Sequence, residues 1–278
     1  MSARFLEGRT AWITGGVTGV GRATAEALSG AGARVAIGSL GPSSVLPQNA
    51  FAHQPDEAET AKALEAIRLQ GSEAIAFPLD VRDEKSVASF HAAVTEEFDD
   101  VDILVNAAGV AAHSLICSDQ SDEIWATVID INLNGPYRTI RRCLEAMIDQ
   151  RWGRIVNIGS TAGNVGYAKY SAYCASKSGL LGLSRAVALE TAEYGITCNV
   201  IQPGQLDTVM GRKGSELRAA RGEGGSDAQE NLDLIAQQLP MKRLVTTNEV
   251  ASLALFLCRD EAAGITAEAI DVAGGALW

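Results

Sequence analysis

The sequence predicts an α/β fold built on a doubly wound parallel sheet, and three observations carry that prediction. Short apolar runs alternate with longer amphipathic stretches along the whole chain. The apolar runs lack polar alternation, as strands buried on both faces do. The length of 278 residues suits one large domain, and no repeat or linker divides it. Because right-handed crossovers place helices on both sides of such a sheet, we expect a single layered domain.

The expected elements follow from this alternation. Strands are expected at the short apolar runs, which are Thr10–Thr14, Arg34–Ile37, Glu73–Phe77, Ile103–Asn106, Arg154–Ile158, Thr197–Ile201 and Ala269–Val272. Helices are expected where apolar residues recur with helical spacing, at Ala23–Ala31, Glu57–Leu69, Lys85–Phe98, Glu123–Asp149, Ala172–Tyr194 and Asn248–Leu257.

Two segments interrupt the alternation. Gly41–Pro55 is rich in Pro, Ser and Gly and is expected to form an extended loop after the second strand. Gly204–Pro240 has a glycine-rich middle and is expected to be a mobile excursion with one or two short helices. Loops of this length inside a compact domain are usually functional or disordered.

The composition excludes several classes of function. With a net charge of −11, the chain has no cluster of Lys and Arg suited to nucleic acid, and the arginines from Arg138 to Arg142 fit a solvated helix face. The five cysteines and three histidines are scattered, so we expect no metal site and reduced thiols. Neither a signal-peptide pattern nor an apolar run of membrane length is visible, which favours a cytoplasmic protein without a membrane partner.

A glycine-rich turn directly follows the first expected strand. It reads Thr14-Gly15-Gly16-Val17-Thr18-Gly19-Val20-Gly21 and leads into a helical pattern. Glycines let the backbone turn sharply and approach a pyrophosphate, whose charge the free N–H groups of the helix N-terminus would meet. The position between a strand and a helix favours a dinucleotide-binding loop over a plain glycine-rich turn.

The TGxxxGxG spacing of this turn resembles the short-chain dehydrogenase/reductase family, and the likeness extends over nearly the whole chain. Leu79–Val81 resembles the family's acidic contact to adenine, and Asn106–Gly109 its motif that steadies the central sheet. Pro203-Gly204 with Thr208 resembles the motif that opens the substrate lid, expected at residues 204–240, and Pro240–Gly275 resembles the family's C-terminal run. The resemblance implies a Rossmann-type fold, NAD or NADP as cofactor, and a homotetramer with two-fold axes.

The residues expected at the cofactor come from these motifs and from the end of the second strand. They are Gly15, Val17, Thr18, Gly19, Val20, Gly21, Ser39, Leu40, Asp80, Val81, Asn106, Ala107, Ala108, Gly109, Tyr173, Lys177, Pro203, Gly204, Leu206 and Thr208.

Tyr173 and Lys177 lie four residues apart in a helical stretch, so both project from one face. An unperturbed tyrosine has a pKa of about 10, and a lysine cation held nearby favours the phenolate. Tyr173 is therefore expected to exchange a proton with an alcohol or ketone as hydride moves. Ser160 ends a strand at the edge where open α/β sheets bind ligands, and is expected to hydrogen-bond the substrate oxygen.

Asn132 resembles the family's fourth catalytic residue, which is implied to hold a water that links Lys177 to solvent. Its N-x-x-G spacing to Gly135 favours it over the neighbouring Asn134. Together these motifs predict an oxidoreductase that transfers hydride between nicotinamide and a secondary alcohol or ketone. The alternatives are a non-catalytic dinucleotide sensor or scaffold on the same fold, and a lyase or epimerase on a related one.

Cofactor choice and substrate are less determined by the sequence. The strand end Gly38-Ser39-Leu40 and the loop residue Thr18 carry no charge, so we expect weak discrimination between the two cofactors with a slight lean to NAD. The insertion Gly41–Pro55 is expected near the adenosine. A largely apolar substrate with few charged anchors is expected to contact His113, Ser160, Val165, Tyr167, Gln205 and Met210.

Overall fold

The computed structural model describes residues 4–42, 44–47, 49–112 and 116–276. Its central sheet consists of seven parallel strands, of which all but the two edge strands are buried over most of their length. They are β1 (Thr10–Thr14), β2 (Arg34–Ser39), β4 (Ala74–Pro78), β5 (Ile103–Asn106), β7 (Gly153–Ile158), β8 (Ile196–Pro203) and β9 (Ala269–Val272). The spatial order β4-β2-β1-β5-β7-β8-β9 confirms the doubly wound arrangement.

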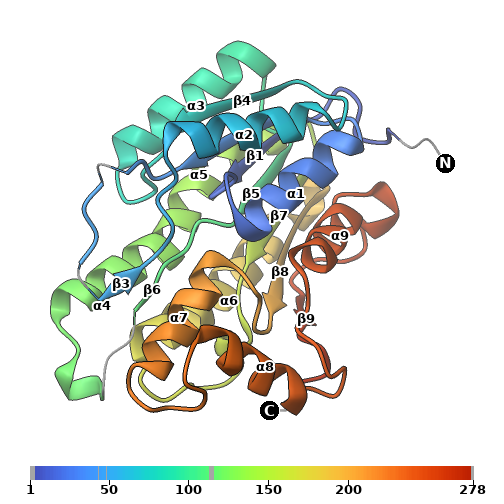
Figure 1. Cartoon of the computed structure of the whole chain (residues 1–278). Coiled ribbons are helices and arrows are strands. Elements are labelled where there is room, and N and C mark those ends of the chain that lie inside the picture. Colours follow the sequence, from blue (N-terminus) through green and yellow to red (C-terminus); the bar gives the residue numbers. More distant parts are fainter. Residues whose placement is uncertain (1–3, 43, 48, 113–115, 277–278) are drawn as a thin grey trace.

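Helices cover both faces of this sheet (Figure 1). Their bounds are α1 (Gly19–Gly30), α2 (Glu57–Arg68), α3 (Glu84–Phe98), α4 (Asp122–Ile129), α5 (Gly135–Asp149), α6 (Ser171–Thr191), α7 (Val209–Ala219), α8 (Ala228–Gln238) and α9 (Thr247–Leu257). Apolar residues of α1, α2 and α9 form one core with the sheet, and those of α3 to α6 form the other. Successive residues of β1 enter opposite cores, which explains why this strand shows no polar alternation.

The single helix expected over Glu123–Asp149 is divided in the structure. A π-helical turn, Asp130–Asn134, lies between α4 and α5. Pro136 is in the first turn of α5 and has no N–H to complete an α-helical hydrogen bond to the preceding turn. The widened turn therefore has a local cause in the sequence, and such turns are frequent at functional sites.

The point where the strand order reverses lies between β1 and β5, at the sheet edge formed by the strands' carboxyl ends. There the hydroxyl of Thr14 accepts hydrogen bonds from the backbone N–H groups of Ala107 and Ala108, at 3.2 and 3.1 Å. Gly15 has a φ of +66°, and a Cβ on it would lie 2.8 Å from the Ala108 nitrogen. Only glycine fits this close approach of two chain segments.

The two segments that interrupt the sequence pattern have structure of their own. In the insertion, β3 (Ala50–Phe51) pairs antiparallel with β6 (Ala111–Ala112). Residues 204–240 contain α7 and α8, as expected for a segment with one or two helices. The buried Asn231 joins them, since its amide donates to the carbonyl of Ser215 at 3.0 Å. Figure 1 shows α7 and α8 beyond the carboxyl ends of β7 and β8.

Candidate active site

One cleft of about 1390 Å³ runs along the carboxyl edge of the sheet. Pockets for drug-sized ligands typically measure about 300–1,000 Å³, so this cleft has room for a dinucleotide and a substrate together. The glycine turn and the end of β2 form one end of the cleft. Helices α7 and α8 and the insertion form the other.

The cleft gathers most residues that the sequence predicts at the cofactor. Those on its wall are Gly15, Thr18, Gly19, Val20, Gly21, Ser39, Leu40, Asp80, Val81, Ala107, Ala108, Gly109, Tyr173, Lys177, Pro203, Gly204, Leu206 and Thr208. Of the expected substrate residues, the wall includes Ser160, Tyr167, Gln205 and Met210.

Other expected residues lie away from the wall. Val17 is 3% exposed and packs in the core below the glycine turn. The Asn106 side chain donates to the amide oxygen of Asn157 at 2.8 Å inside the sheet, so it acts on the sheet rather than facing the cleft. Val165 does not line the cleft. His113 lies outside the described residues.

Tyr173, Ser160 and Lys177 meet at the centre of the cleft. Burial raises the pKa of Tyr173, while a hydrogen bond with the Ser160 hydroxyl opposes that rise. The Lys177 ammonium lies 5.7 Å from the centre of the Tyr173 ring and donates to the carbonyl of Ile158 at 2.8 Å. Burial lowers the pKa of Lys177 to about 8. Burial is thus the largest influence on the pKa of Tyr173.

Asn132 lies in the π-helical turn and is buried. Its amide oxygen accepts from the Val110 N–H at 2.9 Å, and its NH₂ group donates to the Val110 carbonyl at 2.9 Å and to the Ser176 hydroxyl at 3.1 Å. These bonds fix the segment after β5 against α6, next to Lys177. Asn134 instead donates to Asp130 at 3.0 Å.

Charged groups at the adenosine end are already paired. Arg22 lines the cleft but donates to Glu26 at 2.8 Å. Asp80 receives hydrogen bonds from Arg82 at both carboxylate oxygens, at 2.9 and 2.7 Å. Although burial raises the pKa of Asp80, these bonds hold it below its usual value. Ser39 and Leu40 form the wall between these pairs.

The insertion reaches further than the sequence suggested. It begins near the adenosine end, where the Val45 carbonyl accepts from Arg82 at 3.1 Å. It then crosses to the substrate end, where Phe51 and His53 line the cleft. A Cβ on Gly214 of α7 would lie 3.8 Å from the Phe51 ring, so the insertion faces the lid. The pairing of β3 with β6 is a long-range contact that no local pattern announces.

The end of the cleft beside α7 has charged side chains as well as apolar ones. Its wall includes Lys169 after β7 and the lid residues Asp207, Arg212, Arg218 and Glu223. Lys169 lies far along the chain from the other four positions, which fall within residues 207–223, so sequence spacing gave no sign that it joins them.

Further observations bear on partners. Among the described residues, no group of His, Cys, Asp and Glu is arranged to hold a metal ion. A search of those same residues finds no helix long and apolar enough to cross a membrane. The arginines at 141 and 142 both pair with Glu84, and Arg138 pairs with Asp130. This basic stretch is therefore internally compensated, as the interpretation of a solvated helix face predicts.

Comparison with known proteins shows which proteins share this architecture. A family model described as enoyl-(acyl carrier protein) reductase matches residues 15–276. The chain is 33% identical to 2,3-dihydro-2,3-dihydroxybenzoate dehydrogenase of Bacillus subtilis, over 99% of this chain and 98% of that protein. A solved variant of actinorhodin polyketide ketoreductase with NADPH superposes with a TM-score of 0.86 at 33% identity, over 96% of each chain. NAD⁺-bound xylitol dehydrogenase superposes with a TM-score of 0.87 at 28% identity, over 97% of this chain and 99% of the other.

The chain belongs to the short-chain dehydrogenase/reductase family. It is an NAD(P)-dependent oxidoreductase that acts on ketone or alcohol groups of small molecules. The comparisons give no support to a non-catalytic role on this fold.

Proposed function

We propose that Tyr173 is the general acid/base of this oxidoreductase, giving a proton to a ketone or taking one from a secondary alcohol as hydride moves. The observation that carries this proposal is that Tyr173, Ser160 and the buried Lys177 line one cleft that begins at the glycine turn, with the Lys177 ammonium 5.7 Å from the centre of the Tyr173 ring. A phenol and a hydroxyl directed at one point can hold a substrate oxygen and stabilise its developing charge.

Lys177 and Asn132 have supporting roles in this proposal. A bound nicotinamide cofactor supplies or accepts the hydride. Lys177 holds the nicotinamide ribose and, as a cation, favours the phenolate of Tyr173. Asn132 uses one lone pair of its amide oxygen on Val110 and keeps a second for a water that relays protons from Lys177. The bonds of Asn132 to Val110 and Ser176 hold that relay in place.

The substrate class follows from the wall near Tyr173. Tyr167, Leu206, Val209 and Met210 line this part of the cleft, which favours a small or mid-sized ketone with an apolar body. The related Bacillus subtilis protein is named for a ring-bearing diol substrate, which is consistent with a secondary alcohol here. On that basis we propose that the physiological reaction of this chain interconverts such a ketone and its secondary alcohol.

For the cofactor, we favour weak discrimination with a slight lean to NAD. A 2′-phosphate is selected by an Arg or Lys within reach, and a carboxylate at the end of β2 selects against it. Ser39 and Leu40 offer neither charge, and the nearby cations Arg22 and Arg82 are paired with Glu26 and Asp80. Solved relatives are bound to NADPH in one case and to NAD⁺ in another.

Residues 204–240 are proposed to act as the substrate lid. Glycines at 222 and 224 have positive φ and separate α7 from α8, and the segment forms the outer wall of the cleft. Limited proteolysis should cut this segment more slowly in the presence of cofactor and a substrate analogue than without them. Equal cutting rates in the two states would contradict the lid.

We also propose a cytoplasmic homotetramer. The cysteines of the described chain are free thiols, as expected in a reducing compartment. Large apolar side chains of α4, α5 and α6 are exposed, namely Trp125, Tyr137 and Leu189, and helix faces of this kind are buried when copies associate about two-fold axes.

A direct assay tests the proposed reaction. The purified enzyme is mixed with NADH or NADPH and a panel of ketones, and with NAD⁺ or NADP⁺ and the matching secondary alcohols. Nicotinamide absorbance should change with at least one pair and should not change when the same molecules meet the Tyr173→Phe variant. Cofactor binding without turnover of any pair would favour the sensor alternative.

A further inference from the structure

The substrate end of the cleft holds an arginine whose charge the protein leaves unmatched. Arg218 lies near the end of α7, is half-buried and lines the cleft. Within the described part of the chain, no carboxylate or carbonyl accepts a hydrogen bond from its guanidinium. Taking a guanidinium out of water without a partner costs free energy, so such a group is normally paired.

The other charges on this wall are paired with each other. Arg212 donates to Asp207 at 2.6 Å, and Lys169 forms an ion pair with Glu223. The lid end of the cleft therefore has three cations and two carboxylates on its wall. The excess of one positive charge contrasts with the net charge of −11 for the whole chain. The unmatched charge is that of Arg218.

Two tyrosines connect this arginine to the reacting end. Arg218 is near enough to the Tyr170 phenol to act on its pKa, lowering it against the larger rise caused by burial. The Tyr170 phenol in turn is near enough to Tyr173 to act on the pKa of that residue. Tyr170 also lines the cleft. Because Tyr173, Tyr170 and Arg218 line one cleft, a substrate with its carbonyl at Tyr173 can extend along the cleft toward Arg218.

We propose that Arg218 is a specificity residue that binds a carboxylate at the far end of the substrate. This inference rests on the proposed function and defines its substrate class as a keto acid or hydroxy acid. The planar guanidinium offers two parallel N–H groups that match the two oxygens of a carboxylate. A single excess positive charge suits a monoanion, whereas a phosphate ester carries nearly two negative charges at neutral pH. The apolar wall then contacts the chain between the carbonyl and the carboxylate.

Binding measured without turnover tests this inference separately from the chemistry. The Tyr173→Phe enzyme, saturated with NADH or NADPH, is titrated by calorimetry with keto acids from 3-oxobutanoate to 7-oxooctanoate and with their methyl esters. At one chain length the acid should bind about 10- to 100-fold more tightly than its ester, as expected for a hydrogen bond to a charged group. Adding Arg218→Gln should reduce that ratio to about 1 without changing ester affinity.

Two further variants and one further ligand complete the test. Arg218→Lys keeps the positive charge but loses the two parallel N–H groups, so it should retain part of the preference for acid over ester. Lys213→Gln is the matched control, because Lys213 lies exposed on the same helix and pairs with Glu216 away from the cleft; its preference should be unchanged. An acid-to-ester ratio near 1 at every length, or one that survives Arg218→Gln, would overturn the inference. Tighter binding of oxoalkyl phosphates than of the matched acids would overturn the carboxylate assignment.

These outcomes are independent of the proposed reaction. If Tyr173→Phe retains turnover, the assignment of Tyr173 as acid/base is contradicted. The preference for acids over esters is still tested by the Arg218 variants. If the wild-type enzyme converts the keto esters to alcohols but binds no acid more tightly than its ester, the proposed reaction is supported. The proposed carboxylate subsite is then contradicted.

Discussion

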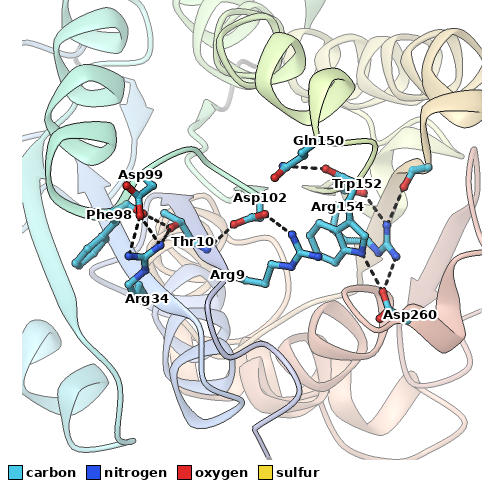
Figure 2. Close-up of polar contacts among 12 residues, drawn as sticks. Arg9, Thr10, Arg34, Phe98, Asp99, Asp102, Gln150, Trp152, Arg154 and Asp260 are labelled. Atoms are coloured by element: carbon cyan, nitrogen blue, oxygen red, sulfur yellow. Dashed lines mark hydrogen bonds and ion pairs between the residues drawn. The ribbon is translucent and has the colours of Figure 1, made fainter.

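Two buried cations at opposite edges of the same sheet are treated very differently. Lys177 is at the carboxyl edge and is 5% exposed, while Arg154 is at the amino edge and is 1% exposed. Figure 2 shows Arg154 beside Trp152 and Asp260. Its guanidinium lies 4.3 Å from the centre of the Trp152 ring and 3.4 Å from the Asp260 carboxylate. In the described chain, Lys177 has one hydrogen-bond acceptor, the carbonyl of Ile158.

The amino edge compensates its charges with its own residues. Arg154 also donates to the carbonyls of Gly153 and Gly195, at 2.9 and 3.1 Å. Nearby, Arg9 lies over the Trp152 ring at 3.8 Å and pairs with Asp102 at 2.7 Å (Figure 2). These contacts give the two guanidinium groups partners within the protein and join the starts of β1, β5 and β7. Burial still lowers the pKa of Arg154, and its Nε has no hydrogen-bond partner. The edge is built for stability.

At the carboxyl edge, no carboxylate offsets the free-energy cost of burying the Lys177 ammonium. Burial lowers the pKa of Lys177 to about 8, and no carboxylate contributes to restoring it. A cation left in this state is available to a cofactor ribose and to a phenolate that forms during reaction. Burial lowers the pKa of both cations, so the difference between the edges lies in their partners. Arg154 has carbonyls, an aromatic ring and a carboxylate beside it, whereas the described chain gives Lys177 one carbonyl.

The largest expected effect comes from removing the catalytic cation. Lys177→Met should lower kcat by at least ~10²-fold, because Tyr173 loses the cation that favours its phenolate. Arg154→Met should change kcat less than ~3-fold, because it lies at the far edge of the sheet. Steady-state kinetics on folded variants would measure both. Equal losses of kcat in the two variants would contradict the proposed difference between the two edges.

The same pair should have opposite effects on stability. At pH 7, Lys177→Met should raise the free energy of unfolding by up to about 3 kcal/mol, the equivalent of moving the lysine pKa from 10.5 to about 8. Arg154→Met should lower it by about 1–3 kcal/mol, because the carbonyls of Gly153 and Gly195 lose their donor. Denaturant unfolding measures both changes.

The pH dependence of the stability gained by Lys177→Met tests whether the buried charge is its cause. The unfolded chain holds the lysine proton more tightly than the native chain, so wild-type stability rises as pH increases from about 8 to 10.5. The advantage of Lys177→Met should therefore shrink over that range. An advantage that stays constant with pH would mean that the buried charge is not its cause.

A smaller effect is expected at the adenosine end, where the charges are compensated as they are at the amino edge. Ser39→Asp adds a carboxylate that repels a 2′-phosphate and binds ribose hydroxyls. It should shift the ratio of kcat/KM toward NAD by at least ~10-fold, from a wild-type discrimination below ~100-fold, or ~2.7 kcal/mol. A wild-type preference for NADP above ~100-fold would show that an uncompensated cation reaches this end.

The sequence predicts the framework well because its signals are local. The expected strand starts lie within one residue of those observed, since buried parallel strands are continuous apolar runs. That Tyr173, Lys177 and Ser160 lie on one cleft could also be anticipated, because Tyr173 and Lys177 are four residues apart in a helix and Ser160 follows a strand. The π-helical turn that contains Asn132 was not predicted, because the sequence there continues a helical pattern.

What the sequence did not predict depends on contacts between distant segments. Strand β3 has two residues and pairs with β6, so neither has a periodicity of its own. Phe51, Lys169 and Arg218 meet on one wall from three separate parts of the chain. The unmatched charge of Arg218 is a property of its surroundings, because the neighbouring Arg212 is identical in type and is paired.

The account depends most on Tyr173 as the proton donor and acceptor at the uncompensated edge. Tyr173→Phe removes only the hydroxyl and its bond to Ser160, so folding and cofactor binding should be nearly unchanged. With thermal unfolding and cofactor Kd measured on the same preparation, kcat for ketone reduction should fall by at least ~10²-fold. A folded Tyr173→Phe enzyme that binds cofactor normally and keeps its turnover would contradict the account.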